Sequence, residues 1–189
     1  MHTEHINNYR EKLISVIGKL DPAQITLWSK AIAEAWDSGR QVFICGNGGS
    51  AGNAIHIAND FIYGIGKGKK PGMRFHALPA NSSIMTCLAN DEGYDKVFSL
   101  QLKAMAHKND LLIVLSGSGN SPNIVEALKV GKEMGMTSFA LLGFSGGKCK
   151  ALADHSIHCD INDMQISEDI QLIVMHMVAQ SLMGGNAYA

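Results

Sequence analysis

Two loops rich in glycine and serine carry the clearest chemical signal in this sequence. The first reads CGNGGS at 45–50 and the second reads SGSGNS at 116–121, and each follows a short apolar run. Each loop also leads into a stretch with helical character. Such a loop presents free backbone N–H groups, hydroxyls and the positive end of a helix, a combination that binds anions. Two such loops in one chain indicate that the protein binds a phosphorylated ligand.

The second loop is the better suited of the two to a single terminal phosphate. It supplies three hydroxyls, from Ser116, Ser118 and Ser121, and Gly117 lets the backbone approach the ligand closely. The alternative is a plain strand-to-helix connection that uses one serine as a helix cap. Neither loop contains lysine. Hydroxyls and backbone dipoles would therefore have to bind the anion.

The first loop also matches the short G-x-G-x-x-A pattern of dinucleotide-binding proteins. That fingerprint requires an acidic residue about 20 positions further on, and the region 64–76 contains none. The GxxxxGK[ST] motif of the P-loop is absent too. We therefore expect no nucleotide cofactor. The net charge of −1 likewise argues against a nucleic-acid partner bound by a broad basic surface.

Two histidines and a carboxylate occupy positions suited to proton transfer or metal binding. His56 and Asp60 are four residues apart on the helix predicted to follow the first loop, so they share one face. His176 interrupts an apolar stretch, 172–178, that we expect to form a buried helix. From residue types alone two interpretations stay open. These side chains form a functional site, or they are a helix-surface pair and a hydrogen-bonded core histidine.

Length and composition predict one domain spanning 1–189. The chain has 189 residues and is 46% hydrophobic, which is enough for a substantial core. No apolar run reaches the roughly 18–20 residues that span a bilayer, and the polar N-terminus lacks the apolar segment of a signal peptide. The four cysteines are scattered, as is typical of reduced thiols. We expect a cytoplasmic protein that binds no membrane.

Strand-like and helical segments alternate along most of the chain. Two amphipathic helices, within about 3–38, come first and are expected either to cover the domain or to pack against another subunit. Strands are predicted at about 41–45, 73–78, 110–115, 137–142 and 155–159. Helices are predicted at about 50–63, 82–90, 94–107, 121–134 and 166–183.

The apolar strands predict the architecture. Short strands without polar alternation are typical of a parallel sheet covered on both faces, and strand–helix alternation implies right-handed crossovers. We therefore expect a doubly wound α/β fold with a five-stranded parallel sheet. Both glycine–serine loops begin where a predicted strand ends, which is the edge at which such sheets bind ligands. We expect the two loops to meet there.

Taken together and in order, these motifs resemble the SIS (sugar isomerase) domain, and within it the bacterial phosphoheptose isomerases. The resemblance implies a homotetramer with its site at a subunit interface. It also implies conversion of sedoheptulose 7-phosphate to D-glycero-D-manno-heptose 7-phosphate through an enediol or enediolate, for ADP-heptose, lipopolysaccharide or other surface glycans. The motifs that carry it are CGNGGSAGNAIHIANDF (45–61), CLANDEGYD (87–95), LSGSGNS (115–121), GFSGGKCKALAD (143–154) and EDIQLIVMH (168–176).

The resemblance also implies roles for individual residues. Asp60 and His176 correspond to the catalytic carboxylate and histidine, one acting as general acid and the other as general base in either order. Zn²⁺ is the implied metal, with the ligands His56, Asp60, Glu168 and His176. The implied substrate contacts are Asn47, Gly48, Gly49, Ser50, Asp60, Asn90, Asp91, Ser116, Gly117, Ser118, Ser121 and Glu168. For Asn90 and Asp91 a plain turn is the alternative.

Two departures from the family pattern leave the substrate open. Asp60 stands where the family usually has Glu, and Glu168 stands where it usually has Gln. A straight helix would also separate Glu168 from His176 by about 12 Å, so binding one ion with both is demanding. Alternative functions are a non-catalytic SIS regulator of the type that binds the replication initiator, a sugar-phosphate sensor, or an isomerase of another ketose phosphate.

Overall fold

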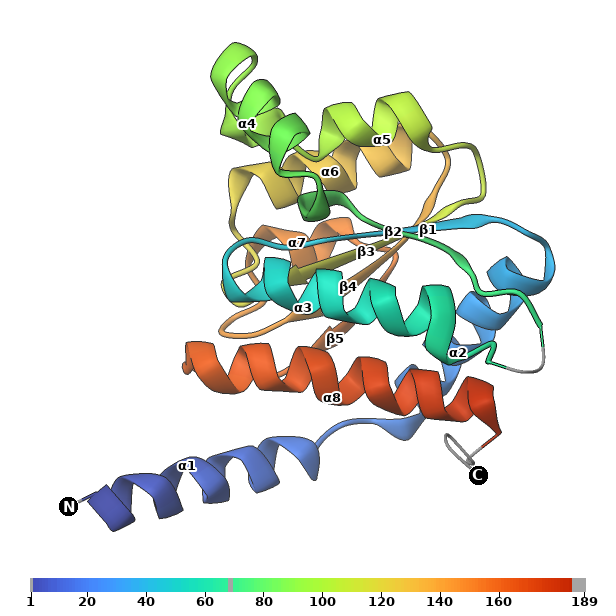
Figure 1. The fold of residues 1–189 in the computed structure, drawn as a ribbon. Coiled ribbons are helices and arrows are strands. Elements are labelled where there is room, and N and C mark those ends of the chain that lie inside the picture. The colour runs from blue at the N-terminus through green and yellow to red at the C-terminus, as the bar shows by residue number, and fades with distance from the viewer. Residues whose placement is uncertain (1, 68–69, 185–189) are drawn as a thin grey trace.

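Five parallel strands form one sheet in the order β2-β1-β3-β4-β5 (Figure 1). The computed structural model describes residues 2–67 and 70–184. The predicted doubly wound α/β fold is confirmed, and each predicted strand lies within two residues of its observed bounds. The strands are β1 Gln41–Cys45, β2 Arg74–Ala77, β3 Leu111–Ser116, β4 Thr137–Leu142 and β5 His155–His158.

Helices cover both faces of this sheet (Figure 1). α1, α2, α3 and α8 pack on one face, and α4 to α7 pack on the other. No helix within the described ranges is long and apolar enough to cross a membrane. The helices are α1 His2–Ile17, α2 Pro22–Asp37, α3 Gly49–Asn59, α4 Ser82–Asp91, α5 Ser99–Met105, α6 Pro122–Glu133, α7 Gly147–Leu152 and α8 Met164–Met183.

The three central strands β1, β3 and β4 are almost wholly buried because each contributes to two cores, whereas the edge strands β2 and β5 carry polar residues and are less buried. Val42 and Ile44 of β1 pack against the core beneath α2, α3 and α8. Phe43 and Cys45 of the same strand point the other way, into the core beneath α5 and α6. Successive side chains of a strand point to opposite faces of the sheet, so a strand covered on both faces has no polar side.

The strand order places the two glycine–serine loops side by side. β1 and β3 are neighbours in the sheet, with Cys45 in register with Val114. The chain winds outward from this pair in both directions, because β2 lies beyond β1 and β4 lies beyond β3. Such a reversal of strand order opens a crevice at the carboxyl ends of the strands. The loops after β1 and β3 flank that crevice.

Three helical segments differ from the predictions. The helix predicted at 94–107 is a 3₁₀ turn, Tyr94–Lys96, followed by the separate α5. The helix predicted at 50–63 leaves α-helical geometry at Asp60–Gly64, where the backbone forms a π-helical turn and the N–H of Ile65 donates to the carbonyl of Asp60. The short helix α7 was not predicted.

Candidate active site

The two loops line one cavity of about 250 Å³ at the carboxyl edge of the sheet. Every loop residue to which the resemblance assigns a ligand contact lies on its wall, from Asn47 to Ser50 and from Ser116 to Ser121. Met164 and Glu168, from the first two turns of α8, complete the wall. The cavity therefore combines backbone, hydroxyls and helix starts from three separate parts of the chain.

A pair of amides ties the two loops together. The side chain of Asn47, in the first loop, donates to Asn123 Oδ1 at 2.9 Å, and Asn123 Nδ2 donates back to Asn47 Oδ1 at 2.8 Å. Asn123 lies in the first turn of α6 and is 1% exposed. Tyr94 also donates to Asn47 Oδ1, at 3.1 Å. Sequence reasoning missed Asn123, although a polar residue in the apolar run after Pro122 was the available signal.

Two glycines let α8 approach the loops closely. A β-carbon at Gly49 would collide with the carboxylate of Glu168. A β-carbon at Gly117 would stand 2.6 Å from the sulfur of Met164. A β-carbon at either position would force the end of the facing side chain to move. Glycine at 49 and 117 therefore lets the Glu168 and Met164 side chains lie directly against the loops.

Gln171 and Asn53 fix α8 against α3. Gln171 Nε2 donates to the hydroxyl of Ser50 at 3.0 Å, and Asn53 Nδ2 donates to the carbonyl of Glu168 and to Gln171 Oε1 at 2.9 Å each. Gln171 is 1% exposed. These bonds hold the two helices that carry the remaining candidate residues.

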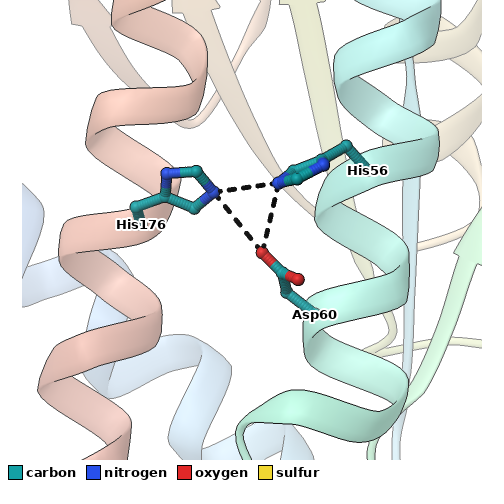
Figure 2. Close-up of side chains that lie close together, drawn as sticks. All are labelled: His56, Asp60 and His176. Carbon is teal, nitrogen blue, oxygen red and sulfur yellow. Dashed lines mark hydrogen bonds and ion pairs between the residues drawn. The ribbon is translucent and has the colours of Figure 1, made fainter. Parts of the chain in front are cut away.

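His56, Asp60 and His176 form a cluster further along the same two helices (Figure 2). The Nε2 atoms of the two histidines are 3.1 Å apart. Asp60 Oδ2 lies 3.5 Å from Nε2 of His56 and 3.4 Å from Nε2 of His176. The predicted sharing of one helix face by His56 and Asp60 is therefore observed. A second cavity, of about 340 Å³, adjoins the cluster.

The prediction that His176 is buried is wrong. Its side chain is 44% exposed, because position 176 lies on the face of α8 that points toward His56 rather than on the core face. The core face of this part of α8 is formed by Val174, Met175 and Val178. His176 is therefore accessible to a ligand, and so is His56, with a side chain that is 52% exposed.

The cluster has the dimensions of a small divalent metal site. Nitrogen and oxygen ligands at about 2.0–2.2 Å from a tetrahedral zinc ion lie about 3.3–3.5 Å from one another. Two of the three atom pairs of the cluster, at 3.5 and 3.4 Å, fall within this range, and the pair of histidine nitrogens, at 3.1 Å, is slightly closer. Two imidazoles and a carboxylate are also a common donor set for zinc. The fourth corner of the tetrahedron has no side chain from the described residues.

Three residues assigned by the resemblance lie away from this cluster. Glu168 is eight residues before His176 on α8, about 12 Å along the axis, and its carboxylate lies at the loop cavity instead. Asn90 and Asp91 end α4, which packs on the other face of the sheet (Figure 1). Their exposed side chains bond to each other, at 2.7 Å. In the described chain neither residue lines the loop cavity.

Comparison with known proteins identifies the family. The SIS domain model matches residues 5–143. The phosphoheptose isomerase of Aliarcobacter butzleri is 38% identical over 152 residues, which cover 80% of each chain. The probable phosphoheptose isomerase of Thermoplasma acidophilum is 37% identical over 147 residues, or 78% of this chain and 80% of the relative. The chain belongs to the phosphoheptose isomerase family of SIS-domain proteins.

Solved structures of this family share the fold. The phosphoheptose isomerase of Neisseria gonorrhoeae superposes with a TM-score of 0.87 at 26% identity, covering 96% of this chain and 98% of that one. The phosphoheptose isomerase of Francisella tularensis superposes with a TM-score of 0.89 at 24% identity and the same coverage. As a member of the phosphoheptose isomerase family, the chain is an isomerase.

Proposed function

We propose that this phosphoheptose isomerase family member converts sedoheptulose 7-phosphate to D-glycero-D-manno-heptose 7-phosphate. The observation that carries the proposal is the placement of two chemically different sites on one pair of helices. The loop cavity, suited to a phosphate, lies at the first turns of α3 and α8. The cluster of His56, Asp60 and His176 lies further along the same helices.

The separation of the two sites suits a long sugar phosphate. Ser50 and His56 are six residues apart on α3, or about 9 Å, and Glu168 and His176 are about 12 Å apart on α8. With C–C bonds of about 1.5 Å, an extended seven-carbon sugar with its terminal phosphate reaches roughly 10 Å, and a five-carbon sugar reaches roughly 7–8 Å. A phosphate in the loop cavity therefore leaves C1 and C2 of a heptose nearest the cluster.

The cluster supplies the groups that aldose–ketose isomerisation requires. The reaction moves a proton between C1 and C2 through an enediolate, and it moves a second proton between the oxygens of these carbons. Asp60 and His176, with reacting atoms 3.4 Å apart, are the proposed pair for these transfers. In the metal-free cluster one acts as base toward carbon while the other donates to oxygen. The imidazole accepts a proton only while it is neutral.

Zinc is the metal that we propose for the same cluster, held by His56, Asp60 and His176. When bound, it would polarise the oxygens at C1 and C2 and stabilise the negative charge of the enediolate. A histidine Nε2 lone pair cannot bind an ion and accept a substrate proton at the same time. Asp60 has a second oxygen, Oδ1, that faces away from both imidazoles toward Asn59. That oxygen stays available for proton transfer in the metal-bound state.

We further propose that a second copy of the chain covers the cluster, within a homotetramer. Large apolar side chains close to its members in the sequence are exposed: Ile55 at 44%, Ile62 at 50% and Met177 at 39%. Exposed apolar side chains of this kind are suited to an interface. Covering the cluster would also exclude water from the enediolate, which protects a reactive intermediate.

A non-catalytic SIS protein that senses a sugar phosphate is the competing function. The loop cavity alone would serve it, and the SIS fold does not by itself decide function. The His/Asp cluster favours an isomerase, because a binding protein has no need of three converging proton-transfer groups. Asp60 and Glu168, which depart from the family pattern, keep other ketose phosphates among the candidate substrates.

Turnover of a panel of ketose phosphates tests the proposal. The purified protein, with and without added zinc, is incubated with five-, six- and seven-carbon substrates, and the aldose products are measured. We expect the seven-carbon substrate to be converted fastest and His176→Ala to abolish conversion. His107→Ala, which removes an exposed histidine from the far end of α5, is the matched control. Tight binding of the sugar phosphates without any conversion would support the sensor instead.

A further inference from the structure

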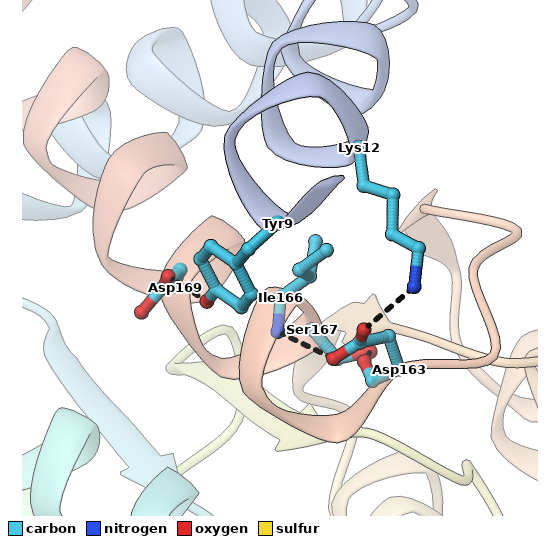
Figure 3. Close-up of polar contacts among 6 residues, drawn as sticks. All are labelled: Tyr9, Lys12, Asp163, Ile166, Ser167 and Asp169. Atoms are coloured by element: carbon cyan, nitrogen blue, oxygen red, sulfur yellow. Dashed lines mark hydrogen bonds and ion pairs between the residues drawn. The ribbon is translucent and has the colours of Figure 1, made fainter. Parts of the chain in front are cut away.

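Helix α1 is attached to the molecule mainly through the start of α8. Val16 is buried, and Tyr9, Leu13 and Ile17 pack against the core with partial burial, while Ile6 and Ile14 are 67% and 61% exposed. Apolar burial therefore holds α1 along one face only. Two polar contacts also reach from α1 to the start of α8 (Figure 3).

The two contacts differ in strength. Lys12 lies 3.5 Å from Asp163, and its side chain is 56% exposed, so this ion pair is weak. The hydroxyl of Tyr9 donates a short hydrogen bond to the carboxylate of Asp169 in a partly buried position. Hydrogen bonds to a charged acceptor are stronger than neutral ones. Tyr9 is therefore the main polar anchor of α1 on α8.

The Tyr9 hydroxyl keeps its proton over the whole neutral range. Burial first, and then the hydrogen bond to Asp169, raise the pKa of Tyr9 to about 12. The negative charges of Asp169 and Asp163 contribute to the same raised pKa. The bond thus persists at any pH at which the protein is expected to work.

The segment of α8 that Tyr9 anchors is the segment that lines the loop cavity. Asp169 follows Glu168 directly in the chain, and Met164 lies one turn earlier. The ends of the Glu168 and Met164 side chains lie against Gly49 and Gly117, closer than a β-carbon at either glycine would allow. A small shift of α8 would therefore change the cavity at both loops. Displacements of about 1 Å are enough to weaken binding and catalysis.

We propose that Tyr9 is a positioning residue for the phosphate cavity. Through its bond to Asp169 it holds the first two turns of α8 in the position, relative to the two loops, in which Glu168 and Met164 form part of the cavity wall. Tyr9 itself is not part of that wall, so it acts through α8 and not on the ligand. This inference rests on the proposed phosphate-binding role of the two loops.

Binding of inorganic phosphate tests this role without depending on turnover. Calorimetry compares the full-length protein with Tyr9→Phe, which keeps the ring and removes the donor. We expect phosphate affinity to fall about three- to tenfold, the effect of losing one hydrogen bond of typical strength. KM for the sugar phosphate should rise by a similar factor while kcat changes less than twofold. Lys12→Ala, on the same helix, should leave phosphate affinity unchanged.

A double-variant cycle identifies the partner. Asp169→Asn should weaken phosphate binding less than Tyr9→Phe does, and the double variant should be no weaker than Tyr9→Phe alone, because both changes remove one interaction. Additive losses would overturn the proposed coupling. A Tyr9→Phe protein with a lower melting temperature but unchanged phosphate affinity would overturn it as well, since α1 would then only stabilise the fold. If the wild-type protein binds no phosphate, the proposed function fails and the positioning role fails with it.

Discussion

His56 and His176 face each other through their Nε2 atoms at 3.1 Å, although they are 120 residues apart in the sequence. Two neutral imidazoles can make this contact only if one donates and the other accepts. Asp60 Oδ2 approaches both nitrogens at hydrogen-bond or metal-ligand range, which brings three donors of electron pairs to one point. Such an arrangement is satisfied by a shared cation, either a proton or a metal ion.

Zinc binding should therefore depend on three residues and not on four. At about 100 times its dissociation constant, zinc should raise the free energy of unfolding by about 2.7 kcal/mol. His56→Ala should remove this stabilisation, because it removes a ligand. Glu168→Gln should retain it, because Glu168 lies at the loop cavity. Thermal melts with and without zinc, together with metal analysis, measure both effects. Loss of zinc from Glu168→Gln would mean that the carboxylate reaches the cluster in the assembled protein.

Two glycines of the same helix should respond oppositely to alanine. Gly49→Ala places a β-carbon against the carboxylate of Glu168, which must move aside at the loop cavity; this should cost about 1 kcal/mol of stability, the low end for overpacking, and weaken phosphate binding. Gly52 is exposed with no atom near its β position. Gly52→Ala should stabilise the protein by about 0.4–1 kcal/mol. Denaturant unfolding checks both. Equal effects at the two positions would contradict the close contact of α8 with the first loop.

The amide pair should couple loop geometry to ligand affinity. Asn123→Ala leaves the side-chain amide of Asn47 without one of its partners in a partly buried position, at a cost of about 1–3 kcal/mol. Phosphate affinity should fall in parallel, since the first loop loses its tie to α6. Asn162→Ala, at an exposed asparagine, should change stability by less than about 0.5 kcal/mol. Denaturant unfolding measures the loss of stability, and calorimetry measures the phosphate affinity. An Asn123→Ala variant with a lower free energy of unfolding but unchanged phosphate affinity would disprove the coupling.

Tyr9 should confer stability that is lost in alkali. Because burial and Asp169 raise the pKa of Tyr9 in the folded protein from 10.0 to about 12, its contribution is complete below pH 10. It should decline as the pH rises from 10 to 12, where the folded hydroxyl ionises. The difference in unfolding free energy between wild type and Tyr9→Phe, followed from pH 8 to 12, isolates this group from other alkaline titrations. A difference that stays constant across that interval would count against the raised pKa.

The sheet was predictable because most of its signal is local. Short apolar runs bounded by glycine and polar residues located the central strands β1, β3 and β4. The edge strands β2 and β5 are more polar, and their positions followed from the alternation of strands and helices. The helices after 93 were harder to place. Gly93 has a φ of 100°, which separates α4 from the segment that follows. That segment was predicted as one helix, but it forms a 3₁₀ turn, Tyr94–Lys96, and the separate α5, Ser99–Met105.

The candidate site was only partly predictable. Spacing placed His56 and Asp60 together, since four residues make about one helical turn. The exposure of His176 depends on the rotation of α8 about its axis, which is set by packing of α8 against α2 and α3 rather than by the local sequence. Asn123 and Gln171 matter through partners 76 and 121 residues away. Contacts of this kind depend on the tertiary arrangement, so a short sequence motif does not predict them.

The loop cavity joins two layers that otherwise have separate interiors. α3 belongs to one side of the sheet and α6 to the other, and their first turns approach each other only at this edge. An anion bound between these first turns would make contacts with both layers and so stabilise their packing at this edge. Release of the ligand would remove this link, so that α3 and α6 could each unfold locally more easily. Protection of their backbone amides from hydrogen exchange should therefore fall in both helices together when the ligand is released.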